Sequence, residues 1–291
     1  DYNKANGTLS GVVLSDLTID HSKAYRGAPL VVCNAEVTLD GSMSFVTGSG
    51  SWYAVNVDPK TGSASLLGGS NLSVSYSGDK VLLQVDNATA SVSVSSFAEK
   101  AGLESVTNGK ETYYDSSDRI SDFCIAKVGE KGFTSLALAI AEAEKVGFGE
   151  IDLMQSITED GINFKTPGTY VLDLNGYTLR SDKTNGEIIA LKTPDLDLTI
   201  KNGTLLSEGA TTYGIYAYNN GGSDTSGDYK NLNLTLDGVK INTKDQSVGV
   251  QGLNSNQNVT IKNSEITCGN TAVYFPPKSG ILTIENSKIT G

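Results

Sequence analysis

The sequence predicts an all-β protein that folds as a right-handed parallel β-helix, a solenoid of stacked turns. Three observations support this fold class. One apolar frame recurs five times between residues 172 and 291. Pairs such as Asn-Gly, Asp-Gly and Asn-Ser stand at the same point of these repeats. The composition, with 32 glycines and only 19% charged residues among 291, suits short strands joined by tight turns.

Each copy of the frame has two apolar residues spaced by two and a third five positions later. The copies are VLDLNGYTLR, LTIKNGTLLS, LTLDGVKINT, VTIKNSEITC and LTIENSKITG, with the apolar triplets Leu172/Leu174/Leu179, Leu198/Ile200/Leu205, Leu234/Leu236/Ile241, Val259/Ile261/Ile266 and Leu282/Ile284/Ile289. A spacing of two puts two side chains on one face of a strand. The turn pair tolerates the positive φ of a sharp corner, and the third residue then points inward from the next strand. Because one turn cannot bury its own apolar face, the turns must stack.

A second set of strands is expected between the copies, in EIIALK, GIYAYN, GVQGLN and AVYFPP. We expect their inward residues to be Ile188, Ile215, Val250 and Val273. The outward neighbours of Tyr216 are then Ile189, Gln251 and Tyr274, and those of Tyr218 are Leu191, Leu253 and Pro276. A β-sandwich is the alternative, but its antiparallel strands would not explain one frame recurring at near-constant spacing.

Two β-helical units are expected. Residues 1–105 repeat the pattern less regularly, since LTID at 17–20 and VTLDGSMSFV at 37–46 resemble LTLDGVKI. Residues 106–132 have no steady period and are expected to form an irregular connector. A helix is predicted near 133–146, because its apolar residues share one face and a glycine follows it. This helix would cap the first turn of a second β-helix over 133–291, which is expected to be truncated at an open end.

The stretch FTSLALAIAEAEKVGFGEIDLMQSITEDG, followed by YVLDLNGYTL, resembles the start of pectate-lyase-like β-helix repeats in large bacterial and some archaeal surface proteins. The resemblance covers 133–291 well and 8–97 loosely. It implies a secreted, adhesin-like protein at the cell surface or attached to the cell wall. Its implied partners are an extracellular glycan or a protein of a host or neighbouring cell. The superfamily also contains lyases and hydrolases, so the resemblance does not decide activity.

Charge and hydropathy exclude two classes of partner. The net charge of -11 argues against nucleic acid, because phosphate binding needs a basic patch. No stretch has the length and apolar character of a transmembrane helix, so we expect no membrane insertion in this fragment.

No combination of side chains predicts a catalytic site, and we expect a non-enzymatic role while leaving enzymatic activity open. The single histidine, His21, has no nucleophile and base pattern beside it. A polysaccharide lyase or glycoside hydrolase would have to use Arg180, expected to face solvent alone, with Asp195 and Asp197 of PDLDLT. We interpret the two acids as part of a polar strand face.

The charged column expected on the outer face of the repeats has mixed signs. Lys201 and Lys262 occupy equivalent positions, and the same column is expected to carry Asn175, Asp237 and Glu285. Such neighbours offset one another on a solvated face.

Two features indicate binding. Tyr216, Tyr218 and Tyr274, with Gln251 beside them, are expected to form exposed columns on which sugar rings can stack. Cover by the inserted loop or by another domain is the alternative for these columns. That loop, YNNGGSDTSGDYKN, contains Asp224 and Asp228, which are weak calcium candidates, because their spacing matches no known calcium motif and a flexible turn is the favoured explanation; no other cofactor is predicted. We therefore expect a rigid surface module with a glycan- or protein-binding face, with a structural spacer and the two enzyme classes as alternatives.

Overall fold

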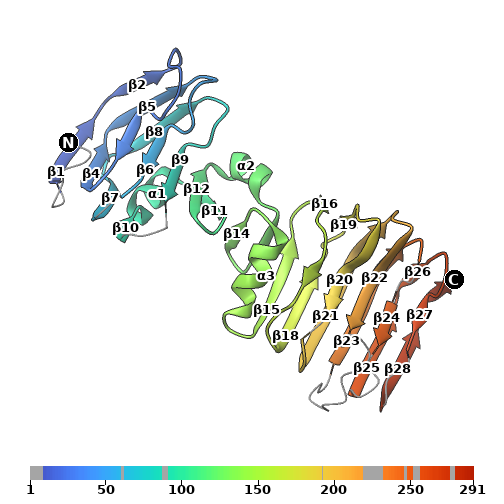
Figure 1. The fold of residues 1–291 in the computed structure, drawn as a ribbon. Coiled ribbons are helices and arrows are strands. Elements are labelled where there is room, and N and C mark those ends of the chain that lie inside the picture. Colours follow the sequence, from blue (N-terminus) through green and yellow to red (C-terminus); the bar gives the residue numbers. More distant parts are fainter. Residues whose placement is uncertain are drawn as a thin grey trace. The chain divides into compact units, whose positions relative to one another are not determined.

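The computed structural model describes residues 9–59, 62–86, 91–191, 193–218, 232–245, 248–251, 256–275 and 279–291, with the backbone alone at 217–218, 248–251 and 256. The chain divides into two compact units, Asp1–Phe123 and Cys124–Gly291. In each unit, short strands pair in parallel with strands of the preceding and following turns (Figure 1). This pairing confirms the predicted parallel β-helix and excludes the antiparallel sandwich.

The first unit has three parallel stacks of strands. The first stack is β1 (Leu9–Ser15), β4 (Ala35–Asp40), β7 (Ser63–Gly68) and β10 (Ser91–Ser93); the second is β2 (Thr18–His21), β5 (Ser42–Thr47) and β8 (Ser73–Ser77); the third is β3 (Leu30–Val32), β6 (Val55–Val57) and β9 (Leu83–Asp86). Alternate residues of β5, among them Met43 and Phe45, are buried inside the stacks, as the two-residue period of a strand requires. Helix α1 (Ser95–Ala101) adds the fully buried Phe97 to this core.

The segment expected to be an irregular connector is instead largely ordered secondary structure. Strands β11 (Glu104–Thr107) and β12 (Glu111–Asp115) form an antiparallel hairpin, and β12 also pairs antiparallel with β9. Helices α2 (Ser117–Ile120) and η1 (Ser121–Phe123) end this unit. Strands β13 (Ala126–Val128) and β14 (Lys131–Phe133) form a second hairpin at the start of the next unit. A hairpin does not repeat the parallel frame, so a search for that period could not detect it.

The second unit also has three stacks. The first is β15 (Phe148–Leu153), β18 (Gly168–Asp173), β21 (Leu196–Ser207), β23 (Leu232–Asn242), β25 (Asn256–Lys262) and β28 (Ser279–Glu285); the second is β16 (Ile157–Thr158), β19 (Thr178–Ser181), the ends of β21 and β23, β26 (Glu265–Thr267) and β29 (Lys288–Thr290); the third is β17 (Ile162–Asn163), β20 (Asn185–Leu191), β22 (Thr211–Tyr218), β24 (Val248–Gln251) and β27 (Val273–Tyr274). Figure 1 shows the arrows of these strands lying side by side.

The apolar frame sets the register of this unit for four of its five copies. Leu198, Leu234, Val259 and Leu282 pair in successive turns, and the other two positions of the frame do the same. In the first copy, the first strand is offset by two residues, because Leu172 pairs with Ile200 instead of Leu198. The corner after β18 is two residues longer than the corner in β21, which restores the register at Leu179 and Leu205.

The predicted corners adopt the left-handed backbone conformation. In successive turns φ is +50° at Asn175, +56° at Asn202, +66° at Gly238, +53° at Asn263 and +46° at Asn286. Asparagine and glycine are the residues that enter this region at low cost. The turn pairs of the sequence therefore have a direct backbone reason.

Helix α3 (Leu136–Glu144) covers the start of the second unit, as predicted, beside β15 (Figure 1). Its buried face contains Leu136, Ala139, Ile140 and Ala143. The Ser135 hydroxyl accepts a hydrogen bond from the Leu138 amide at 3.3 Å and so caps the helix. Within the described residues, no helix has the length and apolar character needed to cross a bilayer.

Candidate functional site

The tyrosine columns expected on the second unit are only partly present. Tyr216 is 9% exposed, and its ring stacks on Tyr213 with centroids 4.8 Å apart. In the third stack, Tyr216 pairs with Ala190 on one side and Gly249 on the other, and Gly249 pairs in turn with Tyr274. Tyr274 is 38% exposed. The expectation of an exposed ring is therefore wrong for Tyr216, which is covered by its own strand neighbour.

The register of this stack also differs from the prediction. Ile189, and not Ile188, pairs with Ile215, and Ile189 and Leu191 belong to the apolar core instead of the outer face. Ile215 pairs through the backbone with Val248 in β24, and not with Val250. All four residues from Ile188 to Leu191 are buried, so this strand has no alternating pattern from which the inward face could be chosen.

The side chains of the remaining predicted binding residues are outside what the structure describes. Gln251 pairs through its backbone with Tyr218, and not with Tyr216 as expected, but neither side chain is described. Asp224 and Asp228, the calcium candidates, lie outside the described residues.

The lyase and hydrolase candidates are separated and paired with other groups. The Arg180 guanidinium is not alone, since it lies 2.7 Å from Asp182 and 3.5 Å from Glu208. Asp195 lies in a turn with φ of +52°, whereas Asp197 lies within β21. The two acids therefore do not alternate along one strand.

A column of acidic and basic side chains lies along the first stack of the second unit. Asp152, Asp173, Lys201, Asp237, Lys262 and Glu285 pair in successive register. Asp173 takes the place that was expected for Asn175. Lys201 Nζ lies 3.2 Å from Asp173 Oδ2, and Lys262 Nζ lies 3.2 Å from Asp237 Oδ2, so the predicted offsetting of charges is present.

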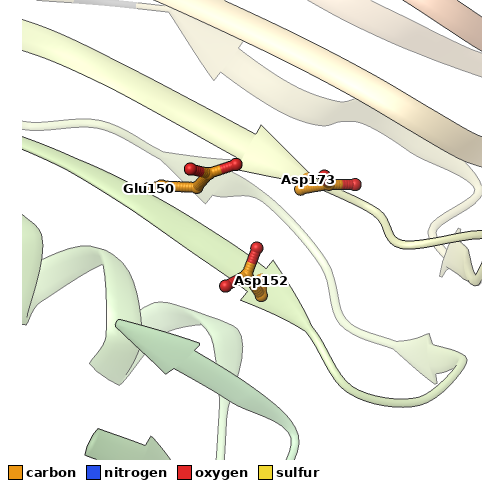
Figure 2. Close-up of side chains that lie close together, drawn as sticks. All are labelled: Glu150, Asp152 and Asp173. Carbon is orange, nitrogen blue, oxygen red and sulfur yellow. The ribbon is translucent and has the colours of Figure 1, made fainter. Parts of the chain in front are cut away.

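Three carboxylates gather at the first end of this column. Glu150, Asp152 and Asp173 each offer an oxygen, and these oxygens lie within 4.8 Å of one another (Figure 2). Burial raises the pKa of the Asp152 carboxyl, and the charges of its two acidic neighbours raise it further. Lys201 Nζ lies only 2.7 Å from Glu150 Oε1. A cation bound among these oxygens would have to displace that ammonium group.

A different site lies in the first unit, where an open hollow gathers three aromatic side chains. The loops that follow β2, β5 and β8 lie in successive turns and build it. Tyr25 and Arg26 come from the first loop, Trp52 and Tyr53 from the second and Lys80 from the third. The hollow has a volume of about 490 Å³, which lies in the range of ligand pockets.

Backbone contacts hold the first two loops together. The Trp52 amide donates a hydrogen bond to the Gly27 carbonyl at 2.8 Å. At Gly50, a Cβ atom would lie 2.3 Å from the Ala24 carbonyl oxygen, so only glycine permits this approach. The aromatic residues thus project from tightly packed loops.

His21 contributes to the same loops. Its Nδ1 lies 2.9 Å from the Ser51 hydroxyl, which also accepts a hydrogen bond from the Gly48 amide. This serine neighbour was not foreseen from the sequence. Ser51 is only 1% exposed, so the pair fixes the second loop instead of presenting a nucleophile to solvent.

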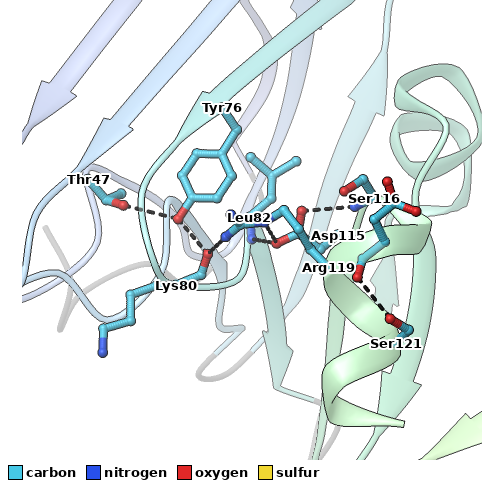
Figure 3. Close-up of polar contacts among 9 residues, drawn as sticks. Thr47, Tyr76, Lys80, Leu82, Asp115, Ser116, Arg119 and Ser121 are labelled. Carbon is cyan, nitrogen blue, oxygen red and sulfur yellow. Dashed lines mark hydrogen bonds and ion pairs between the residues drawn. The ribbon is translucent and has the colours of Figure 1, made fainter.

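The third loop is held by a separate polar network (Figure 3). The Lys80 carbonyl accepts hydrogen bonds from Tyr76 Oη at 2.6 Å and from Arg119 Nη2 at 2.5 Å. The Arg119 guanidinium also lies over the Tyr76 ring, 4.9 Å from its centroid, and Arg119 Nε donates to the nearly buried Asp115 carboxylate at 2.9 Å. The backbone position of Lys80 is therefore fixed, while its side chain stays exposed at the hollow.

The hollow combines ring faces with cations. Trp52 is 55% exposed and Tyr25 is 91% exposed. Aromatic faces of this kind stack on sugar rings or on other flat apolar groups. The residues that line the hollow include two cations, Arg26 and Lys80, and no carboxylate. This local balance is opposite to the net charge of -11 of the whole chain.

This hollow was not predicted from the sequence, although a signal was present. KAYRGAP and GSGSWYAV each place aromatic residues beside glycine, one turn of the solenoid apart. The aromatic residues do not belong to the apolar frame, because they stand in loops. Only the stacking of successive loops brings them together.

Comparisons of this chain with protein-family models, with curated proteins and with solved structures find no match.

Proposed function

We propose that this chain is a non-enzymatic binding module of an extracellular, cell-surface protein, and that it recognises glycans through the hollow of its first unit. The observation that carries the proposal is the exposure of Tyr25 and Trp52 on loops that the backbone holds in place. Because the backbone of these loops is held before binding, only the side-chain conformations have to be ordered when a sugar stacks on the rings.

The scaffold supports this role in a simple way. Each turn of a β-helix contacts only its neighbours, so loops at one corner form a continuous surface while the core stays unchanged. In the first unit, the core side chains are buried, whereas Tyr25 and Trp52 on the loops are exposed. The fold thereby separates stability from recognition.

The test is binding to a broad panel of immobilised glycans and mucins. Wild type is compared with Trp52→Ala and with Tyr25→Ala, and circular dichroism checks that each variant keeps its strands. We expect each variant to lose at least about fivefold in affinity, because stacking on one aromatic ring contributes about 1–3 kcal/mol in the comparable case of nucleic-acid bases.

The matched control is the triple variant Tyr216→Ala/Tyr218→Ala/Tyr274→Ala, which removes the three tyrosines of the second unit that the sequence predicted to bind a ligand. Glycan binding at wild-type affinity by this triple variant, together with weaker binding by Trp52→Ala, supports recognition at the hollow of the first unit. Loss of binding in the triple variant alone would place recognition on the second unit. Absence of glycan binding by wild type would refute the glycan proposal and favour a protein partner or a spacer.

A polysaccharide lyase or hydrolase is the second candidate, and the carboxylate group of Glu150, Asp152 and Asp173 is the observation in its favour. Clustered carboxylates are the catalytic groups of glycosidases, and a raised pKa suits a general acid. Release of unsaturated products or of new reducing ends from the bound glycan, abolished in Asp152→Asn, would support this candidate. Equal, background-level release by wild type and Asp152→Asn would reject it.

A further inference from the structure

We infer that the hollow of the first unit selects glycans that carry a carboxylate, such as uronic or sialic acid residues, through Arg26 and Lys80. This inference rests on the proposed function and specifies the ligand of the same site. It assigns the ring faces of Tyr25 and Trp52 to the sugar ring and the two cations to its carboxylate group.

The state of the arginines is the first support. Arg119 is in an ion pair with Asp115, and Arg180 is in an ion pair with Asp182. Arg26 is exposed at the hollow, and among the described residues no ion pair involves it. A guanidinium group in this position can bind a carboxylate through two parallel hydrogen bonds.

The position of Lys80 is the second support. Its carbonyl is held by Tyr76 and Arg119, so the loop that carries it is fixed, but its ammonium group has no ion pair within the described part of the chain. Arg119 cannot serve in its place, since its guanidinium is already bound to Asp115 and to the Lys80 carbonyl. The hollow thus presents two available cations beside its aromatic rings.

The local charge is the third support. A site for neutral sugars can use both donors and acceptors of hydrogen bonds. A chain with 33 acidic residues against 22 basic ones would supply carboxylates to such a site most often. The charged side chains that line this hollow are both cations. Such a lining attracts anions at short range, even though the chain as a whole is acidic.

The experiment uses pairs of glycans that differ only in the carboxylate. Acidic oligosaccharides that bind wild type are compared with their carboxyl-reduced forms, in which each carboxylate becomes a hydroxymethyl group and the ring is kept. Calorimetric titration is carried out with wild type, with Arg26→Gln/Lys80→Gln and with Trp52→Ala. The variant Lys23→Gln is the charge control, because Lys23 is exposed in the same loop as Arg26 but does not line the hollow.

We expect wild type and Lys23→Gln to bind the acidic form at least tenfold more tightly than the reduced form. Arg26→Gln/Lys80→Gln should bind both forms with the weaker affinity, and Trp52→Ala should bind each form at least about fivefold more weakly than wild type does. Equal affinity of wild type for the two forms, or an acid preference that survives in Arg26→Gln/Lys80→Gln, would overturn the inference while leaving glycan binding intact. Binding of both forms by Trp52→Ala with wild-type affinity would instead overturn the proposed function.

Discussion

The left-handed corner at Asn263 allows a direct test of how the turn residues specify the β-helix. The corner has φ of +53°, and the Asn263 side-chain amide donates a hydrogen bond to Asp237 Oδ1 at 2.9 Å. The equivalent residue of the preceding turn is Gly238, with φ of +66°. We propose to replace Asn263 by alanine and, separately, by glycine.

The two substitutions differ in one respect. Both remove the side-chain hydrogen bond, at a net cost of about 0.5–1.5 kcal/mol. Alanine must also hold a left-handed conformation, which costs about 1–2 kcal/mol, whereas glycine adopts it freely. Glycine has the opposite disadvantage of a more flexible unfolded chain, worth about 0.4–1 kcal/mol. We therefore expect Asn263→Ala to be less stable than Asn263→Gly by up to about 1.6 kcal/mol.

Asn258 is a matched control in the same strand, β25. Its side-chain amide donates to Asn233 Oδ1, also at 2.9 Å, but its backbone is not left-handed. At this position alanine should be more stable than glycine, because an interior strand glycine costs about 0.5–1 kcal/mol relative to alanine. The order of the two substitutions is thus expected to be opposite at Asn258 and Asn263.

Urea unfolding followed by circular dichroism measures these differences, provided that the slope of the transition stays constant among the variants. Thermal unfolding gives a second measure, with about 2–4 °C expected for each kcal/mol in a domain of this size. If Asn263→Ala is more stable than Asn263→Gly, or if the order of the two substitutions is the same at Asn258 and Asn263, the backbone explanation of the turn pairs is wrong.

The remaining predictions concern charge. The folded state raises the pKa of Asp152, so the ionised carboxylate destabilises the folded protein once the pH is above that pKa. Asp152→Asn should therefore stabilise the protein at neutral pH by less than about 1 kcal/mol, and a pH series of melting temperatures should show no gain below the ordinary pKa of 3.8. Asp173→Asn should instead destabilise, because it weakens the ion pair with Lys201, and equal effects of the two substitutions would contradict this assignment. Asp115→Asn, which neutralises the nearly buried partner of Arg119, should cost about 2–3 kcal/mol in urea unfolding, and a cost below about 0.5 kcal/mol would mean that the network around Lys80 does not stabilise the third loop.

Much of the fold was predictable because the residues that repeat along the sequence are the apolar residues of the core. The frame that contains Leu198, Ile200 and Leu205 predicted the register of four turns, and the Asn and Gly pairs predicted the left-handed corners. Prediction failed where that period is broken. The hairpin of β11 and β12 is antiparallel, and the strand from Ile188 to Leu191 is buried on both faces, so neither carries the expected pattern.

The site was less predictable for a related reason. Tyr216 was expected to face solvent because it alternates with Ile215, but alternation does not reveal that Tyr213 stacks on its ring. Tyr25 and Trp52 follow no period, and they become neighbours only because successive loops pack through Gly50 and Gly27. Contacts between loops of different turns are set by the three-dimensional stacking and leave little trace in a single sequence.

The measurement that tests the central claim most directly is the emission of Trp52, the only tryptophan of the chain, during titration with glycans that bind on the panel. Because Trp52 lines the hollow with 55% of its surface exposed, stacking of a sugar on its ring should change both the intensity and the wavelength of its emission in a saturable way. The same dissociation constant should be obtained by calorimetry, and the triple tyrosine variant of the second unit should give the same curve. Binding by calorimetry without any change in the emission of Trp52 would contradict the claim that glycans bind in this hollow.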